Sequence, residues 1–406
     1  NRTTSFSHRV SFIVANITEL HSELQRFYLT SKRLSTAKCI VSRQKNEHYS
    51  MNPSVCFVFG GQGPQWWAMG RQLYHSEDVF RRWIDRIDSE LRLLTTEWNL
   101  HDQLLGVEFE TNTRINETNI AQPALFAIQI GLAALWISWG IHPVAIIGHS
   151  LGEIAAVFVA GRLTLQEAVT VVFHRSRLQH RNTRKNGRML AVSLSEIEAN
   201  DLIDGLEDRV NIAAVNSNRS VTLSGDANTL QDVYDVINVL YPKVFRSWIR
   251  VENAFHSYQM TRYNIEGDVR QALSKIQGNI VREHEIFDTK CSKARLYSTV
   301  IGGQVIRDSC RFDADYWWRN IRQPVLFRQA MDSLLSDFKT EPIRSFIEIS
   351  PHPVLATALN EILSSHTDVL ILPSLKRKYD EQETILSAFV QLARGTADWK
   401  QFFESR

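Results

Sequence analysis

The stretch VAIIGHSLGEIAAVFVAG, residues 144–161, decides the fold class. Its first part, Val144 to Ile147, is a continuous apolar run of the kind found in strands buried on both faces of a sheet. Its last part, IAAVFVAG, has the composition of a buried helix. Between them, residues 148–152 fit the pattern G-x-S-x-G, in which a tight turn lifts a serine hydroxyl off the edge of a sheet. The sequence therefore predicts a buried strand, a sharp turn that presents Ser150, and a helix.

A second strand of the same character comes earlier in the chain. VCFVF, residues 55–59, is wholly apolar, and GGQGPQ, residues 60–65, follows it as a loop rich in turn-forming residues. Helices are expected between the two strands. Buried strands that alternate with helices are typical of a parallel sheet covered by helices. We therefore expect an α/β fold with an α/β-hydrolase-like parallel-sheet core.

Residues 188–251 follow a different pattern, in which short strands and amphipathic helices succeed one another closely. The expected elements are MLAVSL (189–194), EIEANDLIDGL (196–206), VNIAAV (210–215), SVTLSG (220–225), TLQDVYDVINVL (229–240) and VFRSWIRV (244–251). Their order is β-α-β-β-α-β, which is the ferredoxin-like order. We expect a small lobe inserted in the α/β core, with the active site in the cleft between lobe and core.

One apolar stretch approaches the length of a membrane span. Residues 120–139 contain no charged side chain, and about 20 apolar residues suffice to cross a bilayer. Gln122, Gln129 and Ser138 interrupt the stretch, and Pro123 lies where a helix would begin. These features favour the core helix of a globular domain over a membrane span.

The composition excludes several classes of protein. The chain has 406 residues, of which 44% are apolar, and its formal net charge is only +2, which gives no electrostatic argument for binding nucleic acid or an anionic membrane. The 13 histidines are scattered, so we expect no metal site. The cysteines form neither a CxxC pair nor a disulfide ladder, which favours a reducing, cytoplasmic location. They are Cys39, Cys56, Cys291 and Cys310.

Ser150 is a candidate nucleophile and needs a base, which in proteins is usually histidine. His256, in NAFHS (253–257), follows the last expected strand of the small lobe, where the chain returns to the core. His149 and His180 are alternatives, although His149 would point away from the turn. A histidine that only satisfies contacts in its loop remains the structural alternative.

Two backbone N–H groups are candidates for stabilising negative charge beside Ser150. One belongs to Leu151, at the start of the expected helix, and the other to Gln62, in the glycine-rich loop. That loop lacks the pattern G-x-x-x-x-G-K-[ST], so it is not a phosphate-binding loop of that kind.

Arg175 lies on the expected helix LQEAVTVVFHRSRLQHR (165–181), on the same face as Val171 and Leu178. A guanidinium that points into a core requires an anion, because an unpaired buried charge is costly. Two partners stay open at this point. One is a core carboxylate, and the other is the carboxylate of a substrate, whose two oxygens match the guanidinium fork.

Taken together, these pieces resemble the acyltransferase domains of polyketide synthases and animal fatty acid synthases. The matching stretches, in the order of the family, are FVFGGQGPQW (57–66), AQPALFA (121–127), GHSLGE (148–153), RSR (175–177), AVNSNRSVTLSG (214–225), AFHS (254–257), YWWRNIRQPVLF (316–327) and EISPHPVL (348–355). FSHRVSFIV (6–14) resembles the linker that follows a ketosynthase. LPSLKRKYDE (372–381) and DWKQFF (398–403) resemble the linker that follows the acyltransferase.

The resemblance implies a division of the chain, which we expect to be a segment of a larger synthase. The end of the ketosynthase linker would occupy residues 1–54. The α/β core would occupy 55–187 and 252–365, with the small lobe at 188–251 between them. The linker after the acyltransferase would occupy 366–406.

The resemblance also implies roles for matching residues. Ser150 would carry the acyl group and His256 would be its base, held by the backbone carbonyl of Asn320. The family uses this Ser–His pair without a triad carboxylate. The N–H groups of Gln62 and Leu151 would form the oxyanion hole, and Arg175 would pair with the malonyl carboxylate. The residues expected to line the pocket are Gln122, His149, Asn216 and Phe255.

The reaction implied is a two-step transfer of a malonyl group from malonyl-CoA, by way of Ser150, to the phosphopantetheine thiol of an acyl carrier protein. An adjacent ketosynthase domain would be a further partner, and no cofactor would take part in the chemistry. Phe255 favours malonyl over methylmalonyl, because a ring beside the acyl pocket fills the space that an α-methyl group needs. The alternatives are a serine thioesterase or hydrolase, a domain that prefers methylmalonyl or acetyl, and a catalytically inactive scaffold.

Overall fold

The computed structural model describes residues 8–14, 16–29, 39–43, 54–251, 253–278, 293–305 and 310–392. Within the expected ketosynthase linker, 1–54, residues 30–38 and 44–53 lie outside these ranges, and residues 39–43 form a strand that the sequence did not predict. Cys291 and the DWKQFF stretch also lie outside the described residues.

Strands and helices alternate over most of the described chain. The strands are β1 (His8–Phe12), β2 (Cys39–Arg43), β3 (Val55–Phe59), β4 (Ala145–Gly148), β5 (Gly187–Val192), β6 (Val210–Ser217), β7 (Ser220–Asp226), β8 (Arg246–Trp248), β9 (Arg295–Ser298), β10 (Gly303–Gln304), β11 (Ser345–Ile349) and β12 (Leu370–Pro373). The α-helices are α1 (Ile17–Leu29), α2 (Arg71–Ser76), α3 (Asp78–Arg92), α4 (Thr118–Ser138), α5 (Gly152–Val159), α6 (Leu165–His180), α7 (Glu196–Leu202), α8 (Ala227–Leu240), α9 (Ile265–Ala272), α10 (Ala314–Arg322), α11 (Phe327–Asp337), α12 (Ala356–Ile362) and α13 (Glu381–Leu392). Short turns of π- and 3₁₀-helix complete the set at Asp102–Gly106, Glu110–Asn112 and Tyr258–Asn264.

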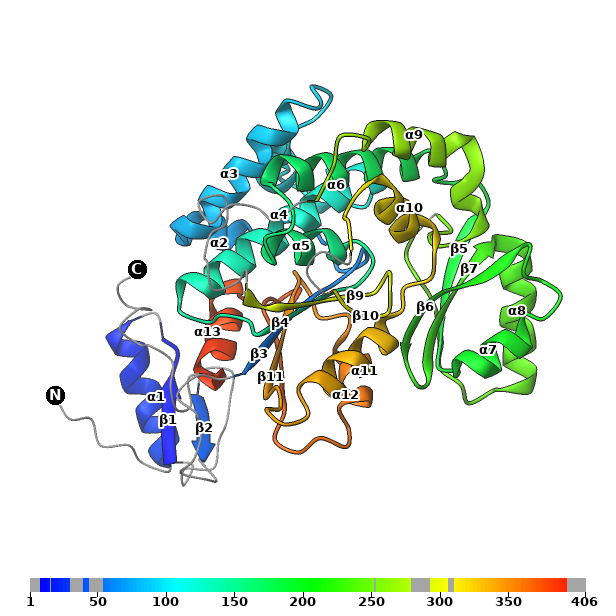
Figure 1. Ribbon diagram of the computed structural model, residues 1–406. Helices are drawn as coiled ribbons and strands as arrows, with labels where there is room; N and C mark the ends of the chain where they lie inside the picture. The colour runs from blue at the N-terminus through cyan, green and yellow to red at the C-terminus, as the bar shows by residue number, and fades with distance from the viewer. Residues whose placement is uncertain are drawn as a thin grey trace.

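The core is a sheet with the strand order β10-β9-β4-β3-β11-β12, in which only β10 runs antiparallel (Figure 1). The strands β3, β4 and β11 are buried along their whole length. Their apolar residues alternate between two helical layers. Phe57 and Ile146 face the layer that contains α3 to α6, and Val58 and Ile147 face the layer of α11 and α12. A sheet covered on both sides explains why the sequence of its central strand β3 is apolar at every position.

The helix α4 accounts for the long apolar stretch. Its composition would suffice for a membrane span, but the span-length window lies wholly within the fold. It packs against α3, α5 and α6. The helix begins at Thr118, so Pro123 lies inside it and not at its start, where the sequence placed it. The prediction of a core helix is confirmed.

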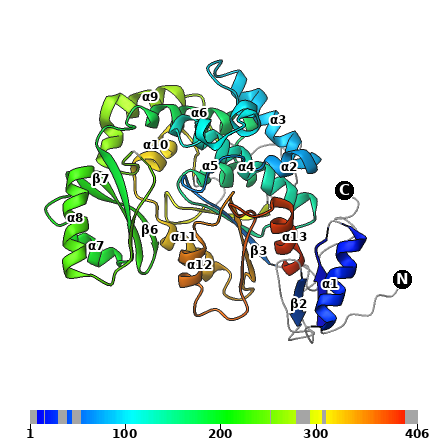
Figure 2. The same cartoon turned by 180° about the vertical axis from the view of Figure 1, so that it is seen from behind.

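The small lobe is a second, antiparallel sheet with the order β6-β7-β5-β8, covered by α7 and α8 (Figure 2). This is the ferredoxin-like arrangement expected for a β-α-β-β-α-β segment. The predicted fold class is therefore confirmed: a parallel-sheet α/β core carries an additional small antiparallel sheet.

Lobe and core are joined through the backbone at one further place. The N–H of Val215 in β6 donates to the carbonyl of Val325 (3.0 Å), and the N–H of Val325 donates to the carbonyl of Ala213 (2.8 Å). Val325 lies between α10 and α11 of the core. This pairing brings the edge of the lobe sheet against the segment that ends α10.

Candidate active site

Ser150 sits at the sharp turn between β4 and α5. Its backbone is left-handed, with φ of 53°, a conformation that residues other than glycine adopt uncommonly and that a serine at a strand-to-helix turn of this kind requires. The turn requires glycine at its end, because a Cβ at Gly152 would overlap the carbonyl oxygen of Phe59 in β3. Leu151 is the N-cap of α5, so its N–H is among those that lack a partner within the helix. The strand, turn and helix thus present the Ser150 hydroxyl at the N-terminus of α5, next to the N–H of Leu151.

His256, in the segment that follows the small lobe, contacts Ser150 directly. Its Nε2 lies 2.8 Å from Oγ of Ser150, and its Nδ1 lies 2.9 Å from the backbone carbonyl of Gln323. Because a carbonyl can only accept, Nδ1 carries the proton and Nε2 is free to accept the proton of Ser150. His256 also has a left-handed backbone, with φ of 58°.

The carbonyl that orients His256 was wrongly assigned from the sequence. It belongs to Gln323, not to Asn320. Asn320 lies inside α10, whereas Gln323 caps the end of that helix with an extended backbone (φ −85°, ψ 159°) and precedes Pro324. A residue before proline is held extended, which turns the Gln323 carbonyl out of the helix and toward the imidazole.

Burial keeps His256 neutral. Burial and, second, the positive charge of Arg175 together lower the pKa of the imidazole to about 3, against the opposing effect of the hydrogen bond to Gln323. The free base is therefore the populated form at neutral pH.

Arg175, on α6, is buried and points at Ser150. Its Nη2 lies 3.3 Å from Oγ of Ser150, and its Nε donates to Oδ1 of Asn320 (3.1 Å). Its Nη1 donates to the side-chain oxygens of Gln122 (2.7 Å) and Gln179 (3.0 Å). Burial lowers the pKa of Arg175 to about 9, which leaves the guanidinium charged at neutral pH. Within the described chain these hydrogen bonds all go to neutral oxygens, so the charge is solvated by amides and a hydroxyl.

Asn320 has a different place from the one expected. Its side chain accepts from Arg175 and also donates, through Nδ2, to the backbone carbonyl of Ser150 (3.0 Å). It therefore connects the buried cation to the turn that carries the serine.

The remaining predicted residues lie around this centre. Nε2 of Gln122 donates to the side-chain oxygens of Gln62 (3.0 Å) and Gln179 (2.8 Å), so the glycine-rich loop is linked to the arginine. His149 faces the small lobe, where its Nε2 lies 2.8 Å from Oδ1 of Asn216. Phe255 is buried next to His256. His180 instead contacts Thr183 at 3.3 Å.

Comparison with known proteins settles the family. The model of the acyl transferase domain family matches residues 56–398. The chain belongs to this family. It is 36% identical over 79% of its length to mycoketide-CoA synthase of Mycobacterium tuberculosis, and 34% identical over 83% to erythronolide synthase EryA2 of Saccharopolyspora erythraea. It spans only 7% and 9% of those two proteins.

Solved acyltransferase domains have the same fold. A loading acyltransferase of the avermectin polyketide synthase is 33% identical, with a TM-score of 0.74 over 84% of this chain and all of its own. The acyltransferase domain from module 8 of the salinomycin polyketide synthase is 28% identical, with a TM-score of 0.81 over 94% of this chain and 84% of its own.

Sequence reasoning missed two polar residues of this acyltransferase site. Gln179 is four residues after Arg175 on α6, a spacing that places the two on one helix face. Gln323 precedes a proline at a helix end, which marks it as extended. Both signals were present in the sequence. Among the described residues, no group of three or more His, Cys, Asp or Glu side chains could hold a metal ion.

Proposed function

We propose that this acyltransferase domain transfers a malonyl group from malonyl-CoA to the phosphopantetheine thiol of an acyl carrier protein, through an acyl ester on Ser150. The observation that supports this most directly is the geometry around one atom. Oγ of Ser150 lies 2.8 Å from Nε2 of His256 and 3.3 Å from Nη2 of Arg175. A neutral base and a buried cation thus converge on one hydroxyl.

In the first half-reaction Oγ attacks the thioester carbonyl while His256 Nε2 takes its proton. The N–H groups of Leu151 and Gln62 then stabilise the tetrahedral oxyanion. Collapse of this intermediate breaks the carbon–sulfur bond, and the departing CoA thiolate takes the proton from His256. Ser150 is left as the acyl ester.

The second half-reaction runs the same steps in reverse order with a new thiol. The phosphopantetheine thiol gives its proton to His256 and attacks the ester, and Ser150 leaves with that proton. We place the domain in a larger polyketide synthase, where a carrier protein and a ketosynthase would be its partners. The proposed chemistry requires no cofactor.

The malonyl preference rests on Arg175 and Phe255. A malonyl carboxylate would replace the neutral oxygens of Gln122 and Gln179 around Nη1 and neutralise the buried charge. The ring of Phe255, buried beside His256, would crowd an α-methyl group. Exclusion of one methyl group is worth about 1–3 kcal/mol, so the discrimination would be about ten- to two-hundred-fold.

Intact-mass measurement tests the proposal. Incubation with malonyl-CoA should add one malonyl group to the wild-type chain and none to Ser150→Ala. His256→Ala should slow the addition by about two to four powers of ten, the usual contribution of a positioned general base. An adduct on Ser150→Ala, or an unchanged rate in His256→Ala, would contradict the mechanism.

The acyl preference and the acceptor are tested in the same assay. An equimolar mixture of malonyl-, methylmalonyl- and acetyl-CoA should give mainly the malonyl adduct. A clear excess of methylmalonyl would overturn the preference but leave acyl transfer intact. Rapid turnover without a thiol acceptor would instead identify a hydrolase or thioesterase.

A further inference from the structure

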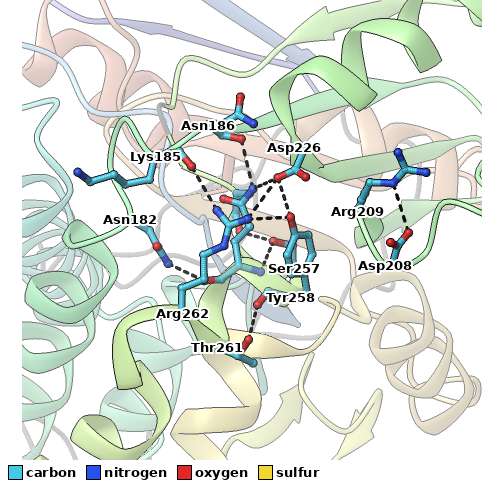
Figure 3. A network of polar contacts seen from close by, with 12 residues as sticks. Asn182, Lys185, Asn186, Asp208, Arg209, Asp226, Ser257, Tyr258, Thr261 and Arg262 are labelled. Carbon is cyan, nitrogen blue, oxygen red and sulfur yellow. Dashed lines mark hydrogen bonds and ion pairs between the residues drawn. The ribbon is translucent and has the colours of Figure 1, made fainter.

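The chain that follows His256 is hydrogen-bonded to the connection between α6 and β5, where the chain enters the small lobe (Figure 3). The carbonyl of Gln259 accepts from Nδ2 of Asn182 (2.7 Å), in the turn after α6. The side chain of Gln259 donates to the carbonyl of Asn186 (3.2 Å), immediately before β5. We call residues 254–262 the histidine segment. Its backbone is thereby fixed three residues from the imidazole.

One carboxylate lies at the centre of these contacts. Oδ1 of Asp226, at the end of β7, accepts from the hydroxyl of Tyr258 (2.6 Å) and from Nε2 of Gln259 (2.6 Å). Arg262 approaches the same oxygen at 3.5 Å and also donates to the Tyr258 hydroxyl (2.9 Å). Figure 3 shows Tyr258 and Arg262 of the histidine segment directed toward Asp226.

Asp226 makes these contacts in place of a more usual role. It is the N-cap of α8, a position at which aspartate normally accepts from the first N–H groups of the helix. Here the side chain makes no cap hydrogen bond. By contrast, Thr164 and Ser195 form complete capping boxes at α6 and α7. The carboxylate of Asp226 is thus directed to the histidine segment instead of to its own helix.

The strand β6 of the small lobe contacts both the histidine segment and the segment that contains Gln323. The N–H of Tyr258 donates to Oδ1 of Asn211 in β6 (3.0 Å). The same strand pairs with Val325, two residues after Gln323. The small lobe therefore holds His256 on one side and the carbonyl that orients it on the other. Ser150 belongs to the core.

We propose that Asp226 is a positioning residue for His256, and that through it the small lobe sets the distance between the base and Ser150. The left-handed backbone of His256 supports this reading, because such a conformation persists only where its surroundings determine it. Asp226 touches neither the serine nor the acyl group in the proposed mechanism. The inference rests on the proposed function, since it concerns the base of that reaction.

The test compares the acylation rate of Ser150 by malonyl-CoA in Asp226→Ala and Asp226→Ser with that of the wild type, using quenched intact-mass measurements. The maximal rate of Asp226→Ala should fall by about tenfold to a hundredfold, the usual effect of misplacing a catalytic group by about 1 Å. The half-saturating concentration of malonyl-CoA should change less than about twofold, because Arg175 and the pocket are untouched. Asp232→Ala, on the exposed face of α8, is the matched control and should behave as wild type.

Two further arms separate positioning from loss of fold. Serine is a strong N-cap, so Asp226→Ser should keep or raise the melting temperature while it loses rate, because its short side chain cannot reach Tyr258. In a His256→Ala background, Asp226→Ala should cause no additional loss of rate. An additional loss of similar size in that background, or wild-type rates in both Asp226 variants, would overturn this inference. The proposed function would still stand in that case, provided that the wild-type chain is malonylated. A wild-type chain that takes no acyl group from any CoA ester would contradict the proposed function, and this inference with it.

Discussion

At the scale of single residues, the site combines an imidazole that burial keeps neutral with a guanidinium whose described hydrogen bonds all go to neutral oxygens. His256 receives its orientation from a backbone carbonyl, where many serine enzymes use a carboxylate. A carboxylate in the place of this carbonyl would also attract the guanidinium of Arg175, whose Nη2 lies 3.3 Å from Oγ of Ser150. A neutral carbonyl avoids this competition and leaves the guanidinium available to an anionic acyl group.

Arg175→Ala separates acyl groups by charge. Removal of the guanidinium takes away the partner of the malonyl carboxylate but leaves Ser150 and His256 in place. We expect malonyl loading to be lost while acetyl loading persists or rises, as measured by intact mass with each CoA ester. Arg177→Ala, an exposed position on the same helix, should leave both unchanged. Equal losses for both acyl groups would show that Arg175 has only a structural role.

The acylation rate should depend little on pH below neutrality. Because the pKa of His256 is lowered to about 3, the imidazole stays in its proton-accepting form as the pH falls from 8 to 5.5. An ordinary histidine, with a pKa of about 6.5, would lose about tenfold in free base over the same interval. We expect kcat/KM for acylation by malonyl-CoA to change less than about threefold, as measured by quenched mass spectrometry at each pH.

Arg175→Ala provides the comparison for this profile. The cation is the second cause of the lowered pKa of His256, so its removal should raise that pKa. The profile for acetyl loading by this variant should therefore turn downward at a higher pH than in the wild type. A tenfold fall in the wild type by pH 5.5 would contradict the assignment of a neutral buried base.

At the scale of elements, α13 is more closely joined to the core than its polar sequence suggests. Glu381, in its first turn, accepts from the N–H groups of Gly70 (2.6 Å), Gln72 (3.0 Å) and Leu73 (3.2 Å). These are donors at the start of α2, whose N-cap is a glycine without a side chain to accept them. Phe389, later in α13, packs against Trp139 with ring centroids 5.4 Å apart. A distant carboxylate thus caps a helix that has no cap of its own.

Glu381→Ala should destabilise the fold without touching the active site. It would leave buried N–H groups of α2 without a partner, which costs about 1–3 kcal/mol for each such donor. We expect the free energy of unfolding, measured with urea, to fall by at least about 2 kcal/mol. Glu383→Ala, two residues further along α13, is the control and should change it little. A Glu381 variant as stable as the wild type would show that water replaces the cap.

Elements with a regular sequence pattern could be predicted, and elements without one could not. The wholly apolar strands β3 and β4 and the lobe order β-α-β-β-α-β could be predicted because each pattern has one dominant structural meaning. The strand β2 lies within a polar stretch, and no alternation of apolar residues marks it. The buried face of α13 depends on distant partners, as the contact of Phe389 with Trp139, 250 positions earlier, illustrates, and local patterns do not contain such contacts.

At the scale of the whole molecule, Ser150 belongs to the core with the parallel sheet, and His256 follows the lobe with the antiparallel sheet. The turn at Ser150 could be placed from the sequence, because G-x-S-x-G between a strand and a helix specifies its own geometry. His256 could be named as a candidate base from its place after the last lobe strand, but 106 positions separate it from Ser150, and the residues alone left His149 and His180 open. The assignment of Asn320 failed for a related reason: a motif identifies a helix end but not which carbonyl is turned outward. Roles that depend on the direction of a single backbone group required the structure.

The pairing of β6 with Val325 has a consequence for recombination between related synthases. The small lobe enters and leaves the core through β5 and β8, which are neighbours in one sheet, so its two ends suggest a self-contained cassette with convenient crossover points. A graft made at those points would nevertheless separate β6 from the segment around Val325 with which it pairs. Residue 325 of the recipient would then pair with a β6 from another protein, two positions from the carbonyl that accepts from His256. A chimera that carries the donor's 323–327 along with the lobe keeps the inherited junction whole.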